Sequence, residues 1–585
     1  MPDRFASSLH SSSARLHLLA AILTLAALLI IARLYHIMIR QHDYYMAVAE
    51  GAQEKYSALI PERGRILLSD LRSGEEFTAA MNRDIFTVFA DPSEFTAKEE
   101  AERVAEELAR FFSYDEEKKF AIFLQLTKPD DRYEIIEQNL EEDRMLMLKK
   151  IELPGIHFKR WPKRVYPEGA LAAHVLGFLG KTEDGLEIGR YGIEGYWQAE
   201  LAGSGGFFVG ATGRGGSWIP LAGRSFKPAE NGADLLLTID RTLQFYACAE
   251  LKKRAAEYEA ISGSLIIMDP KTGAIRAMCS VPDFDPNTYN KVADAVAYNN
   301  TSIFTPYEPG SIFKPLTMAA ALDAGAVTAE TVFTDTGASS AGCSKPIRNA
   351  LDKSYGKTTM IGVLENSINT GMVFVVEQLG KKKFREYVNK FGFGLKEGIE
   401  LDSEVSGTID SLSLGKNDGL DCYSATAAFG QGISVTPLQM VTAVAAIANG
   451  GRLLKPYIVD EIRYPDGREK KTKPTEIREV ITPRTASLVA SMLVSVVDKG
   501  QSKNARVPGY FIGGKTGTAQ IPGKGGYTED TNHSFIGLGT IDDPKFVMLV
   551  KFEKPNRRFA DSTAAPTFAA VAKFVLQYYG VAPTR

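Results

Sequence analysis

The sequence predicts an α+β fold for the larger, C-terminal part of this 585-residue chain. Strand-like segments lie early in that part, at 263–280, and return late, at 510–552, whereas two apolar helical runs, 314–325 and 436–451, lie between them. This order favours one sheet built from early and late strands and packed against the intervening helices. The chain is longer than one hydrophobic core normally serves, which predicts two or three domains.

Residues 16–39 form the most apolar segment of the chain. The run up to Ala32 carries no formal charge, and a snorkelling Arg33 would extend it to the length of a membrane-spanning helix. A cleaved signal peptide is the competing interpretation, but the Ala47-Val48-Ala49 pattern lies too far past the apolar run for cleavage. We therefore expect an uncleaved anchor behind a short tail, residues 1–15. Arginines flank both ends, so charge alone does not fix the orientation.

Residues 40–228 are predicted to form a separate domain. The expected elements are β-rich stretches at 63–70 and 83–92 and helices at 93–112 and 139–153. Thr96 and Glu99 have the spacing of a capping box at the start of the first helix. The glycine-dense segment 203–224 predicts a long hairpin or linker, with a domain boundary just after it.

Residues 229–585 are predicted to form the last domain. Its expected elements are strands at 235–240 and within 263–280, helices at 314–325 and 436–451, strands at 510–520, 534–540 and 545–552, and a final helix at 567–580. The chain's four cysteines are too few and too scattered for a disulfide scaffold or a CxxC zinc site; they are Cys248, Cys279, Cys343 and Cys422. The first lies in a helical run and the second in a strand-like run, so we expect both to be core residues and not a bridge.

Composition narrows the chemistry of the last domain. The net charge of −3 gives no electrostatic reason to expect nucleic acid as a partner. Only His533 of the seven histidines follows residue 230, which excludes a site of several histidine metal ligands there. A Ser-His-Asp hydrolase would have that one base and lacks its Gly-x-Ser-x-Gly motif. A serine nucleophile would therefore need a lysine base, which works if burial and a nearby cation lower its pKa. We expect no metal and no cofactor.

The strongest candidate nucleophile is Ser311, in the motif Ser-x-x-Lys. It follows Pro309-Gly310 at the start of an apolar helical run, and the spacing puts Lys314 on the same helix face. The helix N-terminus would also supply N–H groups for a developing oxyanion. Two other matches lie in loop sequence, which favours chance; they begin at Ser354 and Ser413.

Two further motifs follow in order along the chain. Ser367-Ile368-Asn369 could relay a proton and hold a substrate amide, and Lys515-Thr516-Gly517-Thr518 lies in a glycine-flanked strand that a ligand could approach closely. Each motif has copies in the wrong context, at Lys271-Thr272-Gly273 and Ser502-Lys503-Asn504. Taken singly, each motif is more simply a helix cap, a loop or a turn. The ordered triplet, each member in a suitable helix or strand, indicates an active site.

The triplet resembles the motif set of the penicillin-binding proteins and serine β-lactamases. From about residue 60 to its end the chain is similar to class B penicillin-binding proteins, in RGRILLSD (63–70), RVYPEGALAAHVLGFLG (164–180), GIEGYWQAELAG (192–203), LLLTIDRTLQ (235–244), MDPKTGAIRAMCSVPDFDPNTYN (268–290) and FGQGISVTPLQM (429–440). The resemblance implies a penicillin-binding/β-lactamase-like transpeptidase domain with an antiparallel sheet and helices. It also implies an elongated, dimerisation-type pedestal and a single-pass anchor in the cytoplasmic membrane, with the catalytic domain on the outer side.

The activity that the resemblance implies is a serine D,D-transpeptidase that cross-links peptidoglycan stem peptides. Ser311 would attack the D-Ala-D-Ala carbonyl, with Lys314 as acylation base. Ser367 would pass the proton to the leaving amine, and Asn369 would contact the donor peptide. Lys515 would keep Lys314 neutral and attract the substrate carboxylate. The threonines of the third motif, Thr516 and Thr518, would bind that carboxylate beside Gly517, and the N–H groups of Ser311 and Thr518 would form the oxyanion hole. β-Lactams would stall the enzyme at the acyl stage.

Ser-Ile-Asn followed by Thr-Gly-Met is similar to the septal, division-type branch, since elongation-type enzymes more often carry Asp at the third position. The implied partners are stem peptides and lipid-linked precursor strands, β-lactams, a separate membrane glycan polymerase and division-complex proteins. The charged helical region 93–150 departs from the family pattern.

Other functions remain open at this point. The class A hydrolase motif Glu-x-x-x-Asn is absent between Asn369 and Lys515, which disfavours a β-lactam hydrolase or sensor. A non-catalytic membrane anchor and a bifunctional glycosyltransferase are weaker alternatives.

Overall fold

The computed structural model describes residues 23–25, 27–30, 35, 54–128, 131–211, 224–413 and 419–585. The chain separates into two compact units, Met1–Glu62 with Ala202–Gly232 and Arg63–Leu201 with Ala233–Arg585. The domain division at 228/229 stays a prediction. The expected tail and nearly all of the expected anchor lie outside the described residues. Over the part that is described, no helix combines the length and the apolar character that crossing a bilayer requires.

The first unit contains a three-stranded antiparallel sheet. Its strands, in spatial order, are β1 (Glu54–Leu59), β8 (Gly206–Ala211) and β9 (Arg224–Lys227). Strands β8 and β9 pair as the two arms of a hairpin. This confirms the hairpin interpretation for the paired ends of the glycine-dense segment, whereas 212–223 lie outside the described residues.

The second unit is built around a five-stranded antiparallel sheet. Its strands, in spatial order, are β12 (Ile275–Val281), β11 (Ser262–Met268), β23 (Phe546–Glu553), β22 (Gly526–Gly539) and β21 (Ile512–Gly523). Early and late strands therefore share one sheet, as predicted. Strands β11, β12 and β23 are buried along nearly their whole length, which explains why their sequences are continuous apolar runs and not alternating patterns.

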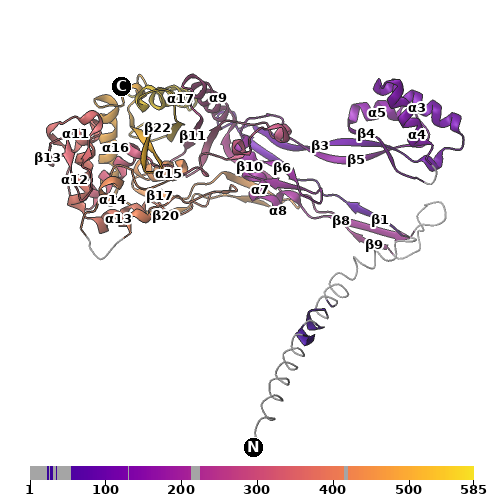
Figure 1. Ribbon diagram of the computed structural model, residues 1–585, viewed down its shortest axis with the longest axis horizontal. Coiled ribbons are helices and arrows are strands. Elements are labelled where there is room, and N and C mark those ends of the chain that lie inside the picture. Colours follow the sequence, from indigo (N-terminus) through magenta and orange to yellow (C-terminus); the bar gives the residue numbers. More distant parts are fainter. Residues whose placement is uncertain are drawn as a thin grey trace, which may run out of the picture. The chain divides into compact units, whose positions relative to one another are not determined.

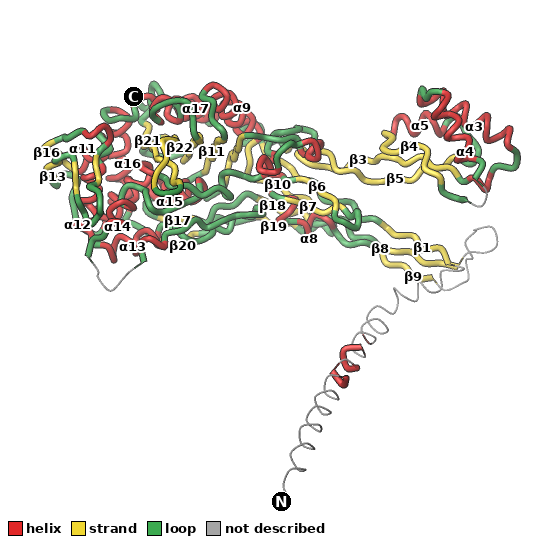
Figure 2. Tube along the Cα trace, viewed as in Figure 1, coloured by secondary structure: helices red, strands yellow, loops and turns green. Residues whose placement is uncertain are grey.

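Helices cover both faces of this sheet (Figures 1 and 2). On one face lie α9 (Arg241–Glu257) and α17 (Ala564–Tyr578); on the other lie α10 (Lys314–Asp323), α15 (Pro437–Ala448) and α16 (Pro483–Asp498). Nearly every residue of helix α15 is buried, which agrees with a sequence that is apolar on all sides of the helix. It begins at a capping box in which Thr436 and Gln439 bond each other's backbone N–H groups.

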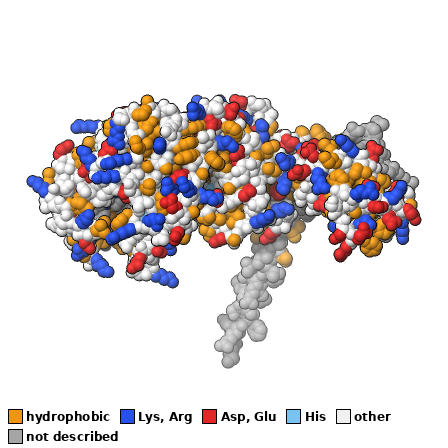
Figure 3. Space-filling model, turned by 90° about the horizontal axis from the view of Figure 1, so that it is seen from above, with side chains coloured by type: hydrophobic (Ala, Val, Ile, Leu, Met, Phe, Trp, Pro, Cys, Tyr) orange, Lys and Arg blue, Asp and Glu red, His pale blue; other side chains and the backbone are white. Residues whose placement is uncertain are grey.

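A second sheet has seven strands, most of which precede the five-stranded sheet in sequence. Its strands, in spatial order, are β19 (Glu469–Lys471), β18 (Val459–Arg463), β10 (Asp234–Asp240), β2 (Ile66–Ser69), β3 (Glu76–Ala90) and β4 (Glu134–Glu141), and β5 (Ile156–Val165) also pairs with β3. The outer half of the long strand β3 carries helices α3 (Lys98–Phe112), α4 (Glu116–Leu126) and α5 (Glu142–Lys149) around a small apolar core. Figure 3 shows acidic and basic side chains together on this end of the unit.

Two sequence expectations fail in this helical cluster. The capping box at Thr96 is wrong: Ala97 occupies the N-cap of α3 without a side-chain bond, and Glu100 accepts from the Thr96 N–H at 3.4 Å. The second helix begins at Glu142 and not at residue 139, because the residues before it belong to β4. Strand pairing overrides local helix propensity there.

The expectation that Cys248 and Cys279 form no bridge is wrong. Helix α9 packs across β12, which brings the Cα atoms of these residues to 5.3 Å, and the two are joined by a disulfide. Cys343 and Cys422 form a second disulfide with Cα atoms 4.7 Å apart. Both bridges join residues far apart in sequence, so their pairing depends on packing that spacing alone does not reveal.

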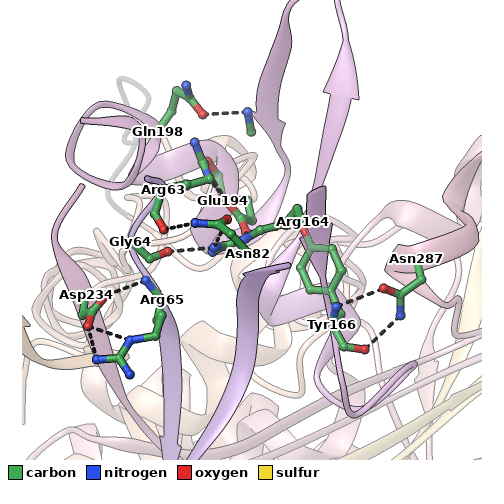
Figure 4. A network of polar contacts seen from close by, with 11 residues as sticks. Arg63, Gly64, Arg65, Asn82, Arg164, Tyr166, Glu194, Gln198, Asp234 and Asn287 are labelled. Carbon is green, nitrogen blue, oxygen red and sulfur yellow. Dashed lines mark hydrogen bonds and ion pairs between the residues drawn. The ribbon is translucent and has the colours of Figure 1, made fainter. Parts of the chain in front are cut away.

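A buried ion cluster joins strands and a helix that precede the five-stranded sheet in sequence (Figure 4). Glu194, on helix α7 (Gly192–Tyr196), is fully buried between two arginines. Its carboxylate accepts from Nε of Arg63 at 2.7 Å and from Nε of Arg164 on β5 at 2.7 Å. Arg164 also donates to the carbonyl of Gly64 at 2.8 Å, and Asn82 of β3 donates to the carbonyl of Arg63 at 2.7 Å. The cluster therefore fixes β3, β5, α7 and the segment leading into β2 against one another.

Candidate active site

Ser311 lies where a short 3-10 turn, Gly310–Phe313, leads into helix α10. Gly310 has a φ of +58°, and a Cβ there would lie 2.9 Å from the Cβ of Ala519 on β21. Glycine therefore lets the turn pack against the strand. The N–H of Gly310 donates to the carbonyl of Gly430 at 2.9 Å, which fixes the turn further. Ser311 itself is half-buried and lines a cavity of about 460 Å³.

Lys314 is fully buried, and its amine is held by the second motif. The amine lies 2.6 Å from the carbonyl oxygen of Ser367, 3.1 Å from the hydroxyl of Ser367 and 2.8 Å from Oδ1 of Asn369. A neutral amine has two N–H donors and one lone pair, so the carbonyl and amide oxygens can accept while the hydroxyl donates. Within the described chain, Lys314 makes no hydrogen bond to Ser311, and its role as the base of that serine stays a prediction.

The backbone conformation of Ser367, in the second motif, permits its two contacts with the Lys314 amine. Ser367 lies between α11 (Met360–Glu365) and α12 (Asn369–Leu379) with a φ of +55°, a left-handed conformation that costs a non-glycine residue free energy. That conformation lets both its carbonyl and its hydroxyl face Lys314. Nδ2 of Asn369 donates to the carbonyl of Arg348 at 2.9 Å, which orients Oδ1 of Asn369 toward the amine.

The two lysines of the site have lowered pKa values. Burial, helped by the positive charge of Lys515, holds the pKa of Lys314 well below its usual range. Burial lowers the pKa of Lys515 to about 7, against the opposing effect of the Asp561 carboxylate. The lowered pKa of Lys314 favours its neutral form, which a lysine base needs. With a pKa of about 7, Lys515 is partly protonated at neutral pH and can attract an anion.

The cavity brings all three motifs together. Its lining residues are Gly310, Ser311, Ala350, Leu351, Lys353, Tyr355, Ser367, Asn369, Phe429, Gln431, Gln501, Thr516, Thr518, Ala519, Phe559 and Asp561. Lys314 and Lys515 lie behind this lining as buried side chains. Gly517 does not line the cavity either. A Cβ at this position would lie 2.7 Å from Oγ of Ser534 and 3.0 Å from the carbonyl oxygen of Pro309. A side chain at Gly517 would push the Ser311 turn away from β21.

Several residues of the cavity were not singled out from the sequence, namely Tyr355, Gln501, Phe559 and Asp561. One further segment of the sequence contributes to the site. The segment Ser502-Lys503-Asn504, a copy of the Ser-x-Asn motif in the wrong context, contacts the third motif and the cavity: Oγ of Ser502 lies 3.3 Å from Oγ1 of Thr516, and Asn504 donates to Asp561 at 2.8 Å.

Replacing Asn369 with Asp is expected to move the acylation rate of Ser311 to higher pH. A carboxylate beside Lys314 favours the ammonium form, so its pKa rises and less neutral base is present at a given pH. We expect acylation about tenfold slower than wild type at pH 6.5 and a smaller difference at pH 9, measured with a fluorescent penicillin. Asn369→Ala, which removes the acceptor without adding charge, should not move the profile upward. Equal slowing at every pH in the Asp variant would contradict this electrostatic role.

Comparison with known proteins identifies the family. The penicillin binding protein transpeptidase domain matches residues 263–573, and the penicillin-binding protein dimerisation domain matches residues 59–237. Stage V sporulation protein D of Bacillus subtilis is 34% identical over 568 residues, which cover 95% of this chain and 84% of that protein. The peptidoglycan D,D-transpeptidase FtsI homolog of Mesostigma viride is 31% identical over 469 residues, covering 75% of this chain and 76% of that one.

A solved structure agrees with this assignment. Penicillin binding protein 3 of Mycobacterium tuberculosis, in complex with aztreonam, superposes with a TM-score of 0.67 at 25% identity, covering 90% of this chain and 98% of that one. A transpeptidase domain over more than half of the chain, a dimerisation domain before it and relatives along nearly the whole length point the same way. The chain belongs to the penicillin-binding proteins, in the class B group that joins these two domains.

Proposed function

We propose that this chain is a peptidoglycan D,D-transpeptidase that works through an acyl-enzyme on Ser311. The observation that carries the proposal is that Ser311, Ser367, Asn369, Thr516 and Thr518 line one and the same cavity, with the two lysines of lowered pKa behind it. The substrate class comes from the relatives, one of which is named a peptidoglycan D,D-transpeptidase.

Acylation proceeds by attack of the Ser311 Oγ on the penultimate D-alanine carbonyl of a donor stem peptide. Neutral Lys314 accepts the hydroxyl proton as the new C–O bond forms. The N–H groups of Ser311 and Thr518 stabilise the oxyanion, each contributing about 3 kcal/mol. Ser367 then passes the proton held by Lys314 to the leaving amine as the C–N bond breaks, and D-alanine is released. Protonated Lys515 and the hydroxyls of Thr516 and Thr518 hold the terminal carboxylate of the donor.

Transfer repeats these steps in reverse with a new nucleophile. The amine of a neighbouring stem peptide attacks the ester carbonyl and loses its proton to neutral Lys314. The ester C–O bond then breaks, and Lys314 returns the proton to Oγ of Ser311. The product is a cross-link and a regenerated hydroxyl. A β-lactam presents an acyl group and a carboxylate in the same arrangement, so its ring opening would leave a stable ester on Ser311.

The biological setting is proposed as septal wall synthesis during division, with elongation as the alternative. The Ser-Ile-Asn motif supports the septal role. In this setting residues 16–39 anchor the chain in the cytoplasmic membrane, and the catalytic domain works on the outer side. Lipid-linked precursor strands would come from a separate membrane glycan polymerase, within a complex of division proteins.

A labelled penicillin tests the enzymatic proposal. The full-length protein should take up one label, on the peptide containing Ser311, and intact-mass analysis should show that this adduct decays slowly. Rapid release of hydrolysed drug would instead favour a β-lactam hydrolase. A fluorescent fusion tests the setting: accumulation at mid-cell supports the septal role, and distribution along the side wall overturns it.

A further inference from the structure

Asp561 is an aspartate of the active-site cavity that the reaction steps above do not use. It lies in a short 3-10 turn, Ala560–Ser562, between the last strand of the catalytic sheet and helix α17. Nδ2 of Asn504 donates to its Oδ2 at 2.8 Å and to its backbone carbonyl at 2.9 Å. Among the described residues, Oδ1 is buried with no hydrogen-bond partner. The neutral side-chain amide of Asn504 therefore holds the Asp561 carboxylate in place but does not compensate its negative charge.

The turn that carries Asp561 is attached to the third motif. The N–H of Ala560 donates to Oγ1 of Thr518 at 3.0 Å, and Thr516 and Thr518 line the cavity together with Asp561. The position of the carboxylate relative to strand β21 is thus set by a bond to the strand itself and by Asn504.

Lys515 directly precedes Thr516, which lines the cavity together with Asp561. The side chain of Lys515 is buried, and within the described chain its amine makes one hydrogen bond, to the carbonyl of Thr516 at 3.0 Å. The part of the chain that is described places no carboxylate within ion-pair distance of it. A buried ammonium without a direct counterion depends on more distant charge, because a low-dielectric site screens that charge weakly.

We propose that Asp561 is a positioning residue whose carboxylate keeps Lys515 protonated at neutral pH, so that Lys515 can hold the substrate carboxylate. The assignment rests on the proposed function, since it gives Asp561 its role through the anion-binding lysine of that reaction. A second consequence follows at Lys314, which stays neutral more readily beside a protonated Lys515.

The other ionisable groups around Lys515 do not supply this charge. Lys314, on α10, is a second amine and disfavours the ammonium form of Lys515. His533, on the neighbouring strand β22, lies between the hydroxyls of Thr531 and Thr563, and burial lowers its pKa to about 4. Burial lowers the pKa of Lys515 to about 7 and raises that of Asp561, whereas each residue's charge opposes the shift of the other. Of these groups, Asp561 is the one whose negative charge opposes the lowering of the Lys515 pKa.

Direct titration of Lys515 tests the inference without any need for enzymatic activity. In full-length protein labelled with ¹³C at lysine Cε, the Lys515 signal, assigned by its loss in Lys515→Arg, should titrate near pH 7. In Asp561→Asn, which keeps an oxygen for Asn504, the midpoint should fall clearly below that of wild type. Asp561→Glu, which keeps the charge, should restore most of the difference, and Asp542→Asn, an exposed loop aspartate, should titrate as wild type. An unchanged midpoint in Asp561→Asn overturns the inference even if Ser311 is acylated normally.

The pH profile of acylation gives the second readout. Asp561→Asn should be acylated about tenfold more slowly than wild type at pH 8.5 and within about twofold of it at pH 5.5, because Lys515 is then protonated in both proteins. A purely structural role would slow acylation equally across this range, and that result would overturn the inference. Failure of wild type to form any adduct would overturn the proposed function, whereas the titration would still decide the role of Asp561.

Discussion

Replacing Ser311 with alanine is expected to abolish covalent labelling by penicillin and to lower the acylation rate by about 10⁴-fold or more. The change removes the only oxygen in the first motif that can form the acyl bond, while the amine of Lys314 keeps its contacts with Ser367 and Asn369. Stability should change little, because Ser311 is half-buried and its side chain makes no hydrogen bond within the described structure. The measurements are gel fluorescence with a labelled penicillin and a melting curve.

Two other serines of the same sequence pattern are matched controls. Ser354 donates to the carbonyl of Asp335 at 2.8 Å, Ser413 is exposed, and neither lines the cavity. Ser354→Ala and Ser413→Ala should label as wild type does. Labelling that persists in Ser311→Ala, or growth of a depleted strain sustained by that variant, would show that another residue or a non-catalytic role carries the function.

The sequence predicted the five-stranded sheet and three motifs that the structure brings to one cavity, because both depend on strong local patterns. Strands buried on both faces appear as apolar runs bounded by turn residues, and the Ser311, Ser367 and Lys515 motifs each carry a distinctive spacing. The shortage of histidine was equally informative, since it directed attention to a lysine base before any fold was known. Buried Lys314 and Lys515 agree with that expectation.

The rest could not be predicted because it depends on contacts between distant segments. Nothing local to Asp561 distinguishes it from a solvent-exposed aspartate in a loop; its role follows from Asn504 and Thr518, which come from other parts of the chain. The same is true of the two disulfides. The left-handed conformation of Ser367 is likewise maintained by tertiary packing, since a serine has no intrinsic preference for it.

Replacing Glu194 with glutamine is expected to give the largest loss of stability of any single change considered, about 3–5 kcal/mol. Glutamine keeps the shape of the side chain but leaves the buried Arg164 and the largely buried Arg63 without an anion. Nη2 of Arg164 already lacks a hydrogen-bond partner among the described residues, so little remains nearby to compensate. Differential scanning calorimetry should show a lower melting temperature. Glu187→Gln, at an exposed position on the preceding strand β7 (Glu187–Arg190), should stay within about 0.5 kcal/mol of wild type.

The pH dependence of this loss separates the ionic role of Glu194 from simple packing. Burial would raise the pKa of Glu194, but Arg164 and Arg63 outweigh it and hold the pKa below the ordinary value of 4.5. A carboxyl whose pKa is lowered on folding stabilises the native state fully above its unfolded pKa, and the contribution is lost as the pH falls toward the folded pKa. The difference in stability between wild type and Glu194→Gln should therefore be constant from pH 6 to pH 8 and shrink below about pH 4.5. A difference that stays the same down to pH 3.5 would mean that glutamine disturbs the packing of α7 against β5, and that the charge of Glu194 contributes little.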